Sequence, residues 1–478
     1  MDIPLKVQKW IVLGGMALLT IASVYLSLHF RINAILGIPL AAVLVLQTIL
    51  DYKFVYYLLI LSIPFSFAVE LPGGLASDFF SEPLMWLFTL VFIVEFLSGR
   101  YLDFRKQIYG FYILVGLLLF WTFFTTLTSE MIMRSFKFFL AKLWYIAAFV
   151  AMGVRIVSNF KTIRVVFWCY FAPLIFLTLV TTVRHALHGF SFEWSNYVMQ
   201  PYFQNHVIYG AVLSLMLPFA WYARLWYAEG TTERRFITFG IWVIIGGLFL
   251  SYSRSAWLSA LFFPVVAVAV ERKWFKRLVY LALVLVMLII VFLVKDNNYY
   301  RFAPDYKTTI FHEGDLGKHL QATFDGSEIS SMERFYRWIG AARMAQARPL
   351  IGFGPSTFSQ VYKRYTEHAF LTYVSDNEDQ STTHNYFLMT FAEQGIVGGL
   401  LFIILCLFML LKGARLYHEV KDLHRKRWLM ACVSSLSIIM LYILLNELIE
   451  VDKIGAMFWL SMVFIHKIEC WEDEEKNR

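Results

Sequence analysis

Apolar stretches of roughly bilayer length recur along almost the whole chain, with short polar connections between them. A helix that spans a membrane needs about 17–25 mostly apolar residues. On this criterion the sequence predicts about fourteen spans, at residues 10–28, 33–50, 54–69, 83–98, 108–126, 136–153, 164–182, 205–226, 236–251, 255–271, 277–294, 394–411, 427–446 and 453–467. The expected fold class is an all-α polytopic membrane protein with about 12–14 transmembrane helices.

One long polar insertion, residues 295–383, interrupts this pattern. We therefore expect an N-terminal transmembrane bundle at 1–294 with about eleven spans, followed by a large, mostly helical loop at 295–383. About three C-terminal transmembrane helices at 384–467 and a short tail at 468–478 complete the predicted organisation.

The composition supports a membrane protein. Hydrophobic residues make up 59% of the 478 residues, charged residues make up 16%, and the mean hydropathy is +0.61. A soluble domain has ~45–50% apolar and ~25% charged residues, so a soluble cytosolic enzyme is excluded. The net charge of +8 does not require nucleic acid as a partner, because in a membrane protein the placement of Lys and Arg reports orientation.

Basic residues gather in alternate connections, as expected if those connections face the cytoplasm. They are Arg100, Arg105 and Lys106; Arg155, Lys161 and Arg164; Arg234 and Arg235; Arg272, Lys273, Lys276 and Arg277; and Lys412, Arg415, Lys421, Arg425, Lys426 and Arg427. This pattern predicts cytoplasmic N- and C-termini and an external 295–383 loop.

The first candidate for chemistry is Ser251-Tyr-Ser-Arg-Ser-Ala-Trp257, a polar break between two spans. Arg254 could be a snorkelling anchor at a helix end. Alternatively, its guanidinium, surrounded by serines, could bind phosphate oxygens with its planar fork of donors.

The second candidate lies in the insertion, where Ser331-Met-Glu-Arg-Phe-Tyr-Arg-Trp338 begins a predicted helix of about four turns that ends before Pro349. Arg334 and Arg337 are three residues apart and share a face of this helix. The alternative interpretation is a solvated amphipathic helix that lies on the membrane.

Two further motifs follow this helix. Pro349-Leu-Ile-Gly-Phe-Gly-Pro-Ser-Thr-Phe358 predicts a compact turn, with a phosphate cradle as the weaker alternative. Thr382-Thr-His-Asn-Tyr-Phe387 stands where the insertion returns to an apolar span, and His384 there could act as an acid, a base or a structural hydrogen-bonding group.

Polar residues also occur at other span ends. Lys142, within the sixth span, could face a negatively charged ligand. His206 follows Asn205, a predicted helix N-cap, and could line the same vestibule. The acids Glu447, Glu450 and Asp452 could pair with the arginines or stand in a wet loop. The four cysteines have no disulfide or metal spacing, and no convincing metal cluster of carboxylates or histidines occurs, so we expect neither a metal nor a cofactor.

The order of these motifs resembles one family. Ser-Arg-Ser between two spans, Glu-Arg-x-x-x-Trp in a long loop, Pro-Leu-Ile-Gly-Phe-Gly-Pro and His-Asn-Tyr before a Gly-rich span are similar to the bacterial O-antigen ligase and O-antigen polymerase superfamily. The resemblance is strongest over about residues 240–411, and it implies a multi-pass protein of the bacterial inner membrane.

The resemblance implies a metal-independent, inverting glycosyltransferase of lipopolysaccharide or other surface-polysaccharide biosynthesis. The donor would be a glycan on undecaprenyl diphosphate, and the acceptor would be a sugar hydroxyl of lipid A-core or of another glycan. The protein would be surrounded by membrane lipid. By motif, the family's functional arginines match Arg254 and Arg334, and its histidine matches His384. We assign Arg337, Lys142, Asn385, Trp338 and His206 to substrate binding.

Three alternatives remain at this point. A polymerase of the same superfamily would differ only in its acceptor. A flippase or other transporter of lipid-linked oligosaccharide would need charged residues in a through-membrane cavity. A non-catalytic assembly scaffold would tolerate substitutions at all three motif positions.

Overall fold

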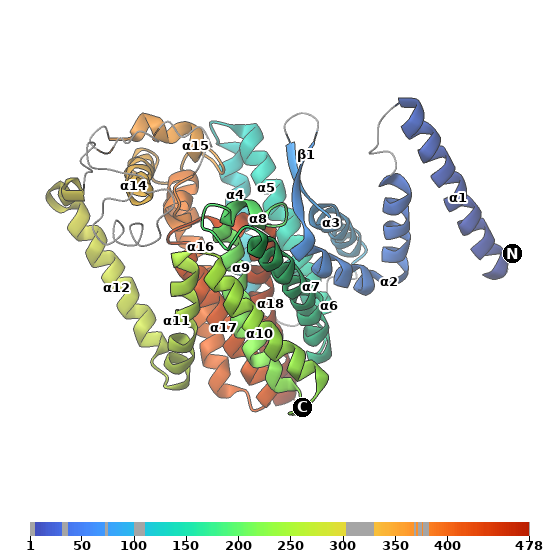
Figure 1. The fold of residues 1–478 in the computed structure, drawn as a ribbon. Coiled ribbons are helices and arrows are strands. Elements are labelled where there is room, and N and C mark those ends of the chain that lie inside the picture. Colours follow the sequence, from blue (N-terminus) through green and yellow to red (C-terminus); the bar gives the residue numbers. More distant parts are fainter. Residues whose placement is uncertain are drawn as a thin grey trace. The chain divides into compact units, whose positions relative to one another are not determined.

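The computed structural model describes residues 5–30, 37–71, 75–99, 110–302, 329–367, 370, 375 and 382–477. The predicted basic connection at Arg100, Arg105 and Lys106, and much of the 295–383 insertion, lie outside these residues. The described part of the chain is almost entirely helical (Figure 1).

Its elements, in chain order, are α1 (Leu5–Phe30), α2 (Gly37–Phe65), β1 (Phe67–Leu71), β2 (Leu75–Phe79), α3 (Ser81–Leu97), α4 (Gly110–Leu127), α5 (Ile132–Tyr145), the π-helix η3 (Ile146–Ala151), α6 (Met152–Ile156), α7 (Phe160–Leu187), α8 (Ser195–Met199), α9 (His206–Ala223), η4 (Arg224–Trp226), α10 (Thr232–Leu250), α11 (Arg254–Glu271), α12 (Phe275–Val294), η5 (Lys295–Phe302), α14 (Ile329–Ala347), α15 (Phe358–Val361), η6 (Tyr362–Tyr365), α16 (Tyr386–Glu419), α17 (Leu423–Tyr442), η8 (Leu448–Glu450) and α18 (Asp452–Lys476).

The predicted fold class is confirmed. Among the described residues, nine helical segments are long and apolar enough to cross a membrane. The helices α1, α3, α10 and α17 also coincide with predicted spans but are shorter or more polar. The protein is therefore an all-α polytopic membrane protein, while the orientation of its termini and loop stays a prediction.

The predicted spans 33–50 and 54–69 correspond to a single element, α2, that is broken in the middle. Asp51 has φ −153° and ψ 86°, values outside the helical region. Its carboxylate accepts the backbone N–H groups of Lys53 (3.0 Å) and Phe54 (3.3 Å), as an N-cap does at the start of a new helix. The predicted span 54–69 ends too late in the sequence, because the helix ends at Phe65 and β1 follows.

Residues 67–71 and 75–79 pair as antiparallel strands, which the hydropathy pattern does not reveal. Phe67 pairs with Phe79 and Leu71 with Leu75. The turn signal Pro-Gly-Gly at positions 72–74 of the sequence could have identified the pairing.

Contacts along the chain define two compact units, Met1–Ser62 and Ile63–Arg478. The first contains α1 and most of α2. The second contains all other described elements, including every site candidate. The four-part division by topology, at 294, 383 and 467, remains a prediction.

Hydropathy and burial are inverted in the second unit. The most apolar helix, α12, has a mean hydropathy of 3.0 and no buried residue in its apolar window, whereas α18 has only 1.2 and is 89% buried in the corresponding window. Lipid is as apolar as a leucine side chain, so the purely apolar helix loses nothing by facing lipid. Ionisable residues must face the bundle interior, and α18 carries four buried ones: Asp452, Lys453, His466 and Glu469.

Candidate functional site

The Ser-Arg-Ser motif forms the turn between α10 and α11, as the sequence predicts. Arg254 is the first residue of α11 and is half-buried. The hydroxyl groups of Ser253 and Ser255, on either side of it, lie 3.0 Å apart, and the Trp257 indole donates to the Leu248 carbonyl at 2.6 Å. The turn is thus fixed by its own polar side chains.

The end of α17 brings this motif and the His384 motif together. The Tyr442 hydroxyl lies near those of Ser253 and Ser255, and the next carbonyl, that of Ile443, accepts the backbone N–H of Tyr386 at 2.8 Å. Two motifs about 130 residues apart in sequence therefore meet at consecutive residues of a third segment. We call this region, where α11 and α16 begin and α17 ends, the motif end of the bundle.

The predicted loop helix is confirmed as α14, and it holds the backbone that leads to His384. The Trp338 indole donates to the Thr383 carbonyl at 2.9 Å, and the Arg337 guanidinium donates to the Thr382 carbonyl at 3.5 Å. An amphipathic helix lying free on a membrane would not make these contacts. Instead, α14 packs on α16 and its side chains fix the segment before the histidine.

His384 itself has a positive φ of 54°, which is uncommon for a residue other than glycine. Burial, reinforced by the positive charges of Arg334 and Arg337, lowers the pKa of His384 to about 3. The imidazole is therefore neutral at physiological pH and has a lone pair that can accept a proton. Its Nδ1 lies 3.9 Å from the Glu447 Oε2 atom.

Glu447 was among the acids whose role the sequence left open. Its carboxylate is largely shielded from solvent, which raises the pKa of Glu447, and it accepts a hydrogen bond from the Thr383 hydroxyl at 3.2 Å. Glu447 thus contacts the residue next to His384 as well as approaching the imidazole. This position resembles that of an acid that orients a catalytic histidine.

The two loop arginines differ in their surroundings. Arg337 is buried and lies 3.4 Å from Glu333, one helical turn earlier, and Glu333 accepts the Ser375 hydroxyl at 2.6 Å. Arg334 is less buried. The guanidinium of Arg337 is therefore committed to the fold, and Arg334 is the better placed of the two to meet a ligand.

The Pro349–Phe358 motif is a structural turn, and its backbone does not cradle a phosphate. The Glu393 carboxylate, buried in α16, already accepts the backbone N–H groups of Ser356 (2.8 Å) and Phe358 (2.9 Å). The N–H of Gly354 likewise donates to the Glu393 carbonyl at 2.8 Å. The turn is thus bound to both the side chain and the backbone of Glu393.

This docking coincides with a break in α16 at Gly395, which has φ 68° and ψ −174°. A Cβ atom at Gly395 would lie 2.2 Å from the Leu350 carbonyl oxygen, so no other residue fits. The Ile396 N–H donates to the Pro349 carbonyl at 2.8 Å, and the Trp121 indole donates to the Gln394 carbonyl at 2.8 Å. The backbone groups freed by the break are thus satisfied, as burial requires.

Lys142 lies close to this first segment of α16, but its charge is already balanced. It is buried, its Nζ lies 2.6 Å from a Glu450 oxygen, and it donates to the Tyr386 hydroxyl at 3.2 Å. Asn385 is similarly engaged, because its side chain caps α16 by accepting the Leu388 N–H at 3.0 Å. Both residues support the fold around His384.

His206 opens α9, and the predicted N-cap of this helix is confirmed: Asn205 accepts the Ile208 N–H at 2.9 Å. The His206 Nδ1 lies 2.7 Å from the Asn196 side-chain oxygen. A Cβ on Gly210, one turn further, would lie 2.7 Å from the Ala256 Cβ, so α9 begins beside the start of α11. His206 therefore lies at the motif end, on the side of Arg254.

The acids of the last hairpin pair neither with the site arginines nor with water alone. Glu447 lies beside His384 and Glu450 pairs with Lys142. Asp452 accepts the hydroxyl groups of Ser66 and Ser81, the latter at 2.8 Å, and lies 3.4 Å from Lys453. The pairings of Glu450 with Lys142 and of Asp452 with Ser66 and Ser81 span more than 300 residues, and no local sequence signal predicts them.

Among the residues that the structure describes, no group of three or more His, Cys, Asp and Glu side chains is arranged to hold a metal ion. No curated protein matches the sequence significantly. The family model described as O-antigen ligase does match, over residues 239–403. This segment, about a third of the chain, contains the turn at Arg254, the helix α14, the Pro349–Phe358 turn and His384. Over this segment, the chain is similar to the O-antigen ligase family.

Proposed function

We propose that this protein is an O-antigen ligase-like glycosyltransferase. It moves a glycan from undecaprenyl diphosphate to a sugar hydroxyl of lipid A-core, or of a similar acceptor, on the outer face of the bacterial inner membrane. The family match supports a ligase or polymerase in polysaccharide biosynthesis, and the arrangement at the motif end supports the specific roles that follow.

The observation that carries the proposal is a neutral, half-buried imidazole beside fixed positive charge. Burial and the two loop arginines hold the pKa of His384 at about 3. Arg334, the less buried of the two, would attract the diphosphate of the donor, whose negative charge is costly near lipid unless it is paired. The proposed base would then lie beside the proposed anion site.

In the proposed reaction, a hydroxyl oxygen of the acceptor attacks the anomeric carbon of the donor sugar. The bond between that carbon and the phosphate oxygen breaks, and undecaprenyl diphosphate leaves with the bonding electrons. His384 takes the hydroxyl proton, and Arg254 and Arg334 stabilise the charge that grows on the leaving diphosphate, a contribution that is often the largest in such sites. A single displacement inverts the anomeric configuration, and no step uses a metal.

Donor binding would also activate the base. A group with a pKa of about 3 is a weak base, because catalytic bases work best with a pKa near the ambient pH. A bound diphosphate would neutralise the charge of Arg334 and so remove part of the repulsion that lowers the pKa of His384. The imidazole would become more basic only when the donor is in place.

The remaining side chains act on position. Glu447 orients the imidazole, and Trp338 and Arg337 hold the backbone that presents it. Lys142, with Glu450 and Tyr386, fixes the first turn of α16. Transport is less well supported, because the deep cation Lys142 is already paired with a carboxylate rather than left for an anionic cargo.

The test compares surface polysaccharide in cells that carry wild-type protein, His384→Ala or Arg254→Ala at equal protein levels. We expect both variants to lose the joined polysaccharide. A matched control is His418→Ala, whose ring Nε2 donates to the Val270 carbonyl (2.8 Å) near the opposite end of α16. Full joining with His384→Ala would refute the role of His384, and equal loss with His418→Ala would indicate a general folding defect.

The gene deletion separates ligase from polymerase. A ligase predicts that long glycans accumulate on undecaprenyl diphosphate. A polymerase predicts single repeat units on an otherwise capped surface lipid. Transport of labelled lipid-linked glycan by purified protein in vesicles, with no covalent product, would instead identify the protein as a flippase and exclude both the ligase and the polymerase.

A further inference from the structure

The loop between α7 and α9 carries a group of aromatic side chains that the proposed reaction does not use. The rings of His188 and Trp194 are stacked, with centroids 4.1 Å apart and an interplanar angle of 13°. Tyr197 meets Trp194 edge-on at 5.3 Å. Trp194 is 37% exposed and Tyr197 57% exposed, so both rings keep a free surface. We call His188, Trp194 and Tyr197 the aromatic platform.

The loop that bears the aromatic platform is held in place at several points. The Arg184 guanidinium donates to the carbonyl groups of Tyr197 (3.4 Å) and Gln200, and the His185 ring lies 2.9 Å from the Ser191 carbonyl oxygen. The Tyr252 hydroxyl donates to the Phe190 carbonyl. A surface fixed in this way loses little conformational entropy when it binds a ligand.

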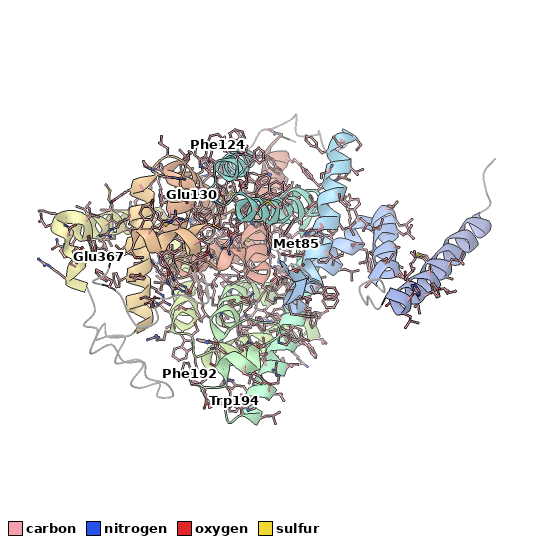
Figure 2. The ribbon with its side chains drawn as sticks, turned by 90° about the horizontal axis from the view of Figure 1, so that it is seen from above. Met85, Phe124, Glu130, Phe192, Trp194 and Glu367 are labelled. Carbon is pink, nitrogen blue, oxygen red and sulfur yellow. The ribbon has the colours of Figure 1, made fainter. Side chains whose placement is uncertain are left out.

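The aromatic platform adjoins the Arg254 motif. Phe192, in the same loop, lies 5.6 Å from Tyr252 and 6.1 Å from His206, between ring centroids. Tyr252 precedes Arg254 by two residues. Phe192 and Trp194 lie together at the edge of the bundle in Figure 2. A molecule held at Arg254 would therefore have the aromatic platform beside it.

Trp and Tyr are also common at membrane interfaces, where their rings meet lipid headgroups. Two observations favour a different ligand. The exposed residues Glu193 and Asn196 alternate with the aromatic ones, and a carboxylate is unfavourable where rings enter lipid. In addition, Trp194 stacks on His188 and stays 37% exposed, as expected for a stacking surface.

Flat aromatic rings flanked by hydrogen-bonding side chains suit a sugar, because a pyranose has an apolar C–H face and a polar rim of hydroxyl groups. We propose that the aromatic platform binds the sugar chain of the lipid-linked donor, beside the diphosphate at Arg254. The identification of this sugar chain with the donor rests on the proposed function.

The probe is the lipid-free polysaccharide that mild acid releases from undecaprenyl diphosphate of the producing cells. Its dissociation constant is measured by calorimetry with the purified full-length protein in detergent. Trp194→Ala is expected to weaken binding about fivefold or more, since a ring contact contributes on the order of 1 kcal/mol. Trp194→Phe keeps a stacking ring and should retain most of the affinity, and Tyr197→Ala should lose part of it.

The matched control is Trp274→Ala. Trp274 is 52% exposed and stands in the turn between α11 and α12, so it is an exposed tryptophan at the end of α11 opposite Arg254. Unchanged binding with both Trp194→Ala and Tyr197→Ala, equal loss with Trp274→Ala, or no binding by the wild-type protein would each overturn the proposal. His384→Ala distinguishes failure of the proposed function from failure of the binding proposal. This variant should bind the polysaccharide normally. If it also still transfers glycan, the proposed function is wrong, whereas sugar binding by the aromatic platform is unaffected.

Discussion

Replacing Glu393 by alanine should loosen the Pro349–Phe358 turn, which is docked on the first segment of α16. The buried carboxylate accepts the backbone N–H groups of Ser356 at 2.8 Å and Phe358 at 2.9 Å. Each buried donor left without a partner costs about 1–3 kcal/mol, so the two together cost roughly 2–6 kcal/mol. Relief of the buried negative charge offsets part of this, and we expect a net loss of at least ~2 kcal/mol. Glu393→Gln keeps one acceptor oxygen and should cost about half as much.

The assay follows the monodisperse protein by size-exclusion chromatography after heating in detergent. At roughly 2 °C per kcal/mol, Glu393→Ala should lower the midpoint by about 4 °C or more. The matched control is Glu130→Ala. The Glu130 carboxylate pairs with Arg348 (2.7 Å) and Arg364 (3.3 Å) in a partly exposed position, and the residue is labelled in Figure 2. Exposed pairs contribute ~0–1 kcal/mol, so its midpoint should hardly move. Equal midpoints for Glu393→Ala and the wild type would refute the structural role of this carboxylate.

Three further predictions follow from the site. Because the pKa of His384 is about 3 without donor, kcat/KM of the wild type should stay flat as the pH falls from 7 to 5. Arg334→Gln removes one positive neighbour of His384, so kcat/KM of this variant should begin to fall at a higher pH. A fall in kcat/KM near pH 6.5 in the wild type would contradict the assignment of His384 as the base. Lys142→Met removes the cation beside Glu450, which keeps the hydrogen bond from the Tyr386 hydroxyl, and should destabilise the protein by ~2 kcal/mol, less when combined with Glu450→Gln, whereas additive losses in thermal midpoint would rule out the pair. Glycan transfer by purified protein should survive EDTA, and loss that Mg²⁺ restores would show that the reaction uses a metal.

Much of the fold follows from the sequence because bilayer thickness fixes the length of a spanning helix. The predicted α14 is confirmed because its start and stop signals are local, and the polar turn before α11 is confirmed because an arginine and three serines interrupt an apolar pattern. The break at Asp51 in α2 also falls at the predicted boundary between the spans 33–50 and 54–69, because a polar residue interrupts the apolar pattern there. One error has an equally local cause: the paired strands 67–71 and 75–79 are too short to disturb a window of bilayer length.

The sequence by itself determined the class of protein, the order of its helices and the three motifs, since these depend on neighbouring residues. Only the tertiary structure decided what each charged group meets. Glu393 serves the Pro349–Phe358 turn, Glu450 neutralises Lys142, and Glu447 stands beside His384. These partners come from segments up to several hundred residues apart, and a buried charge is tolerable only when the packing of the bundle brings a partner within a few ångströms.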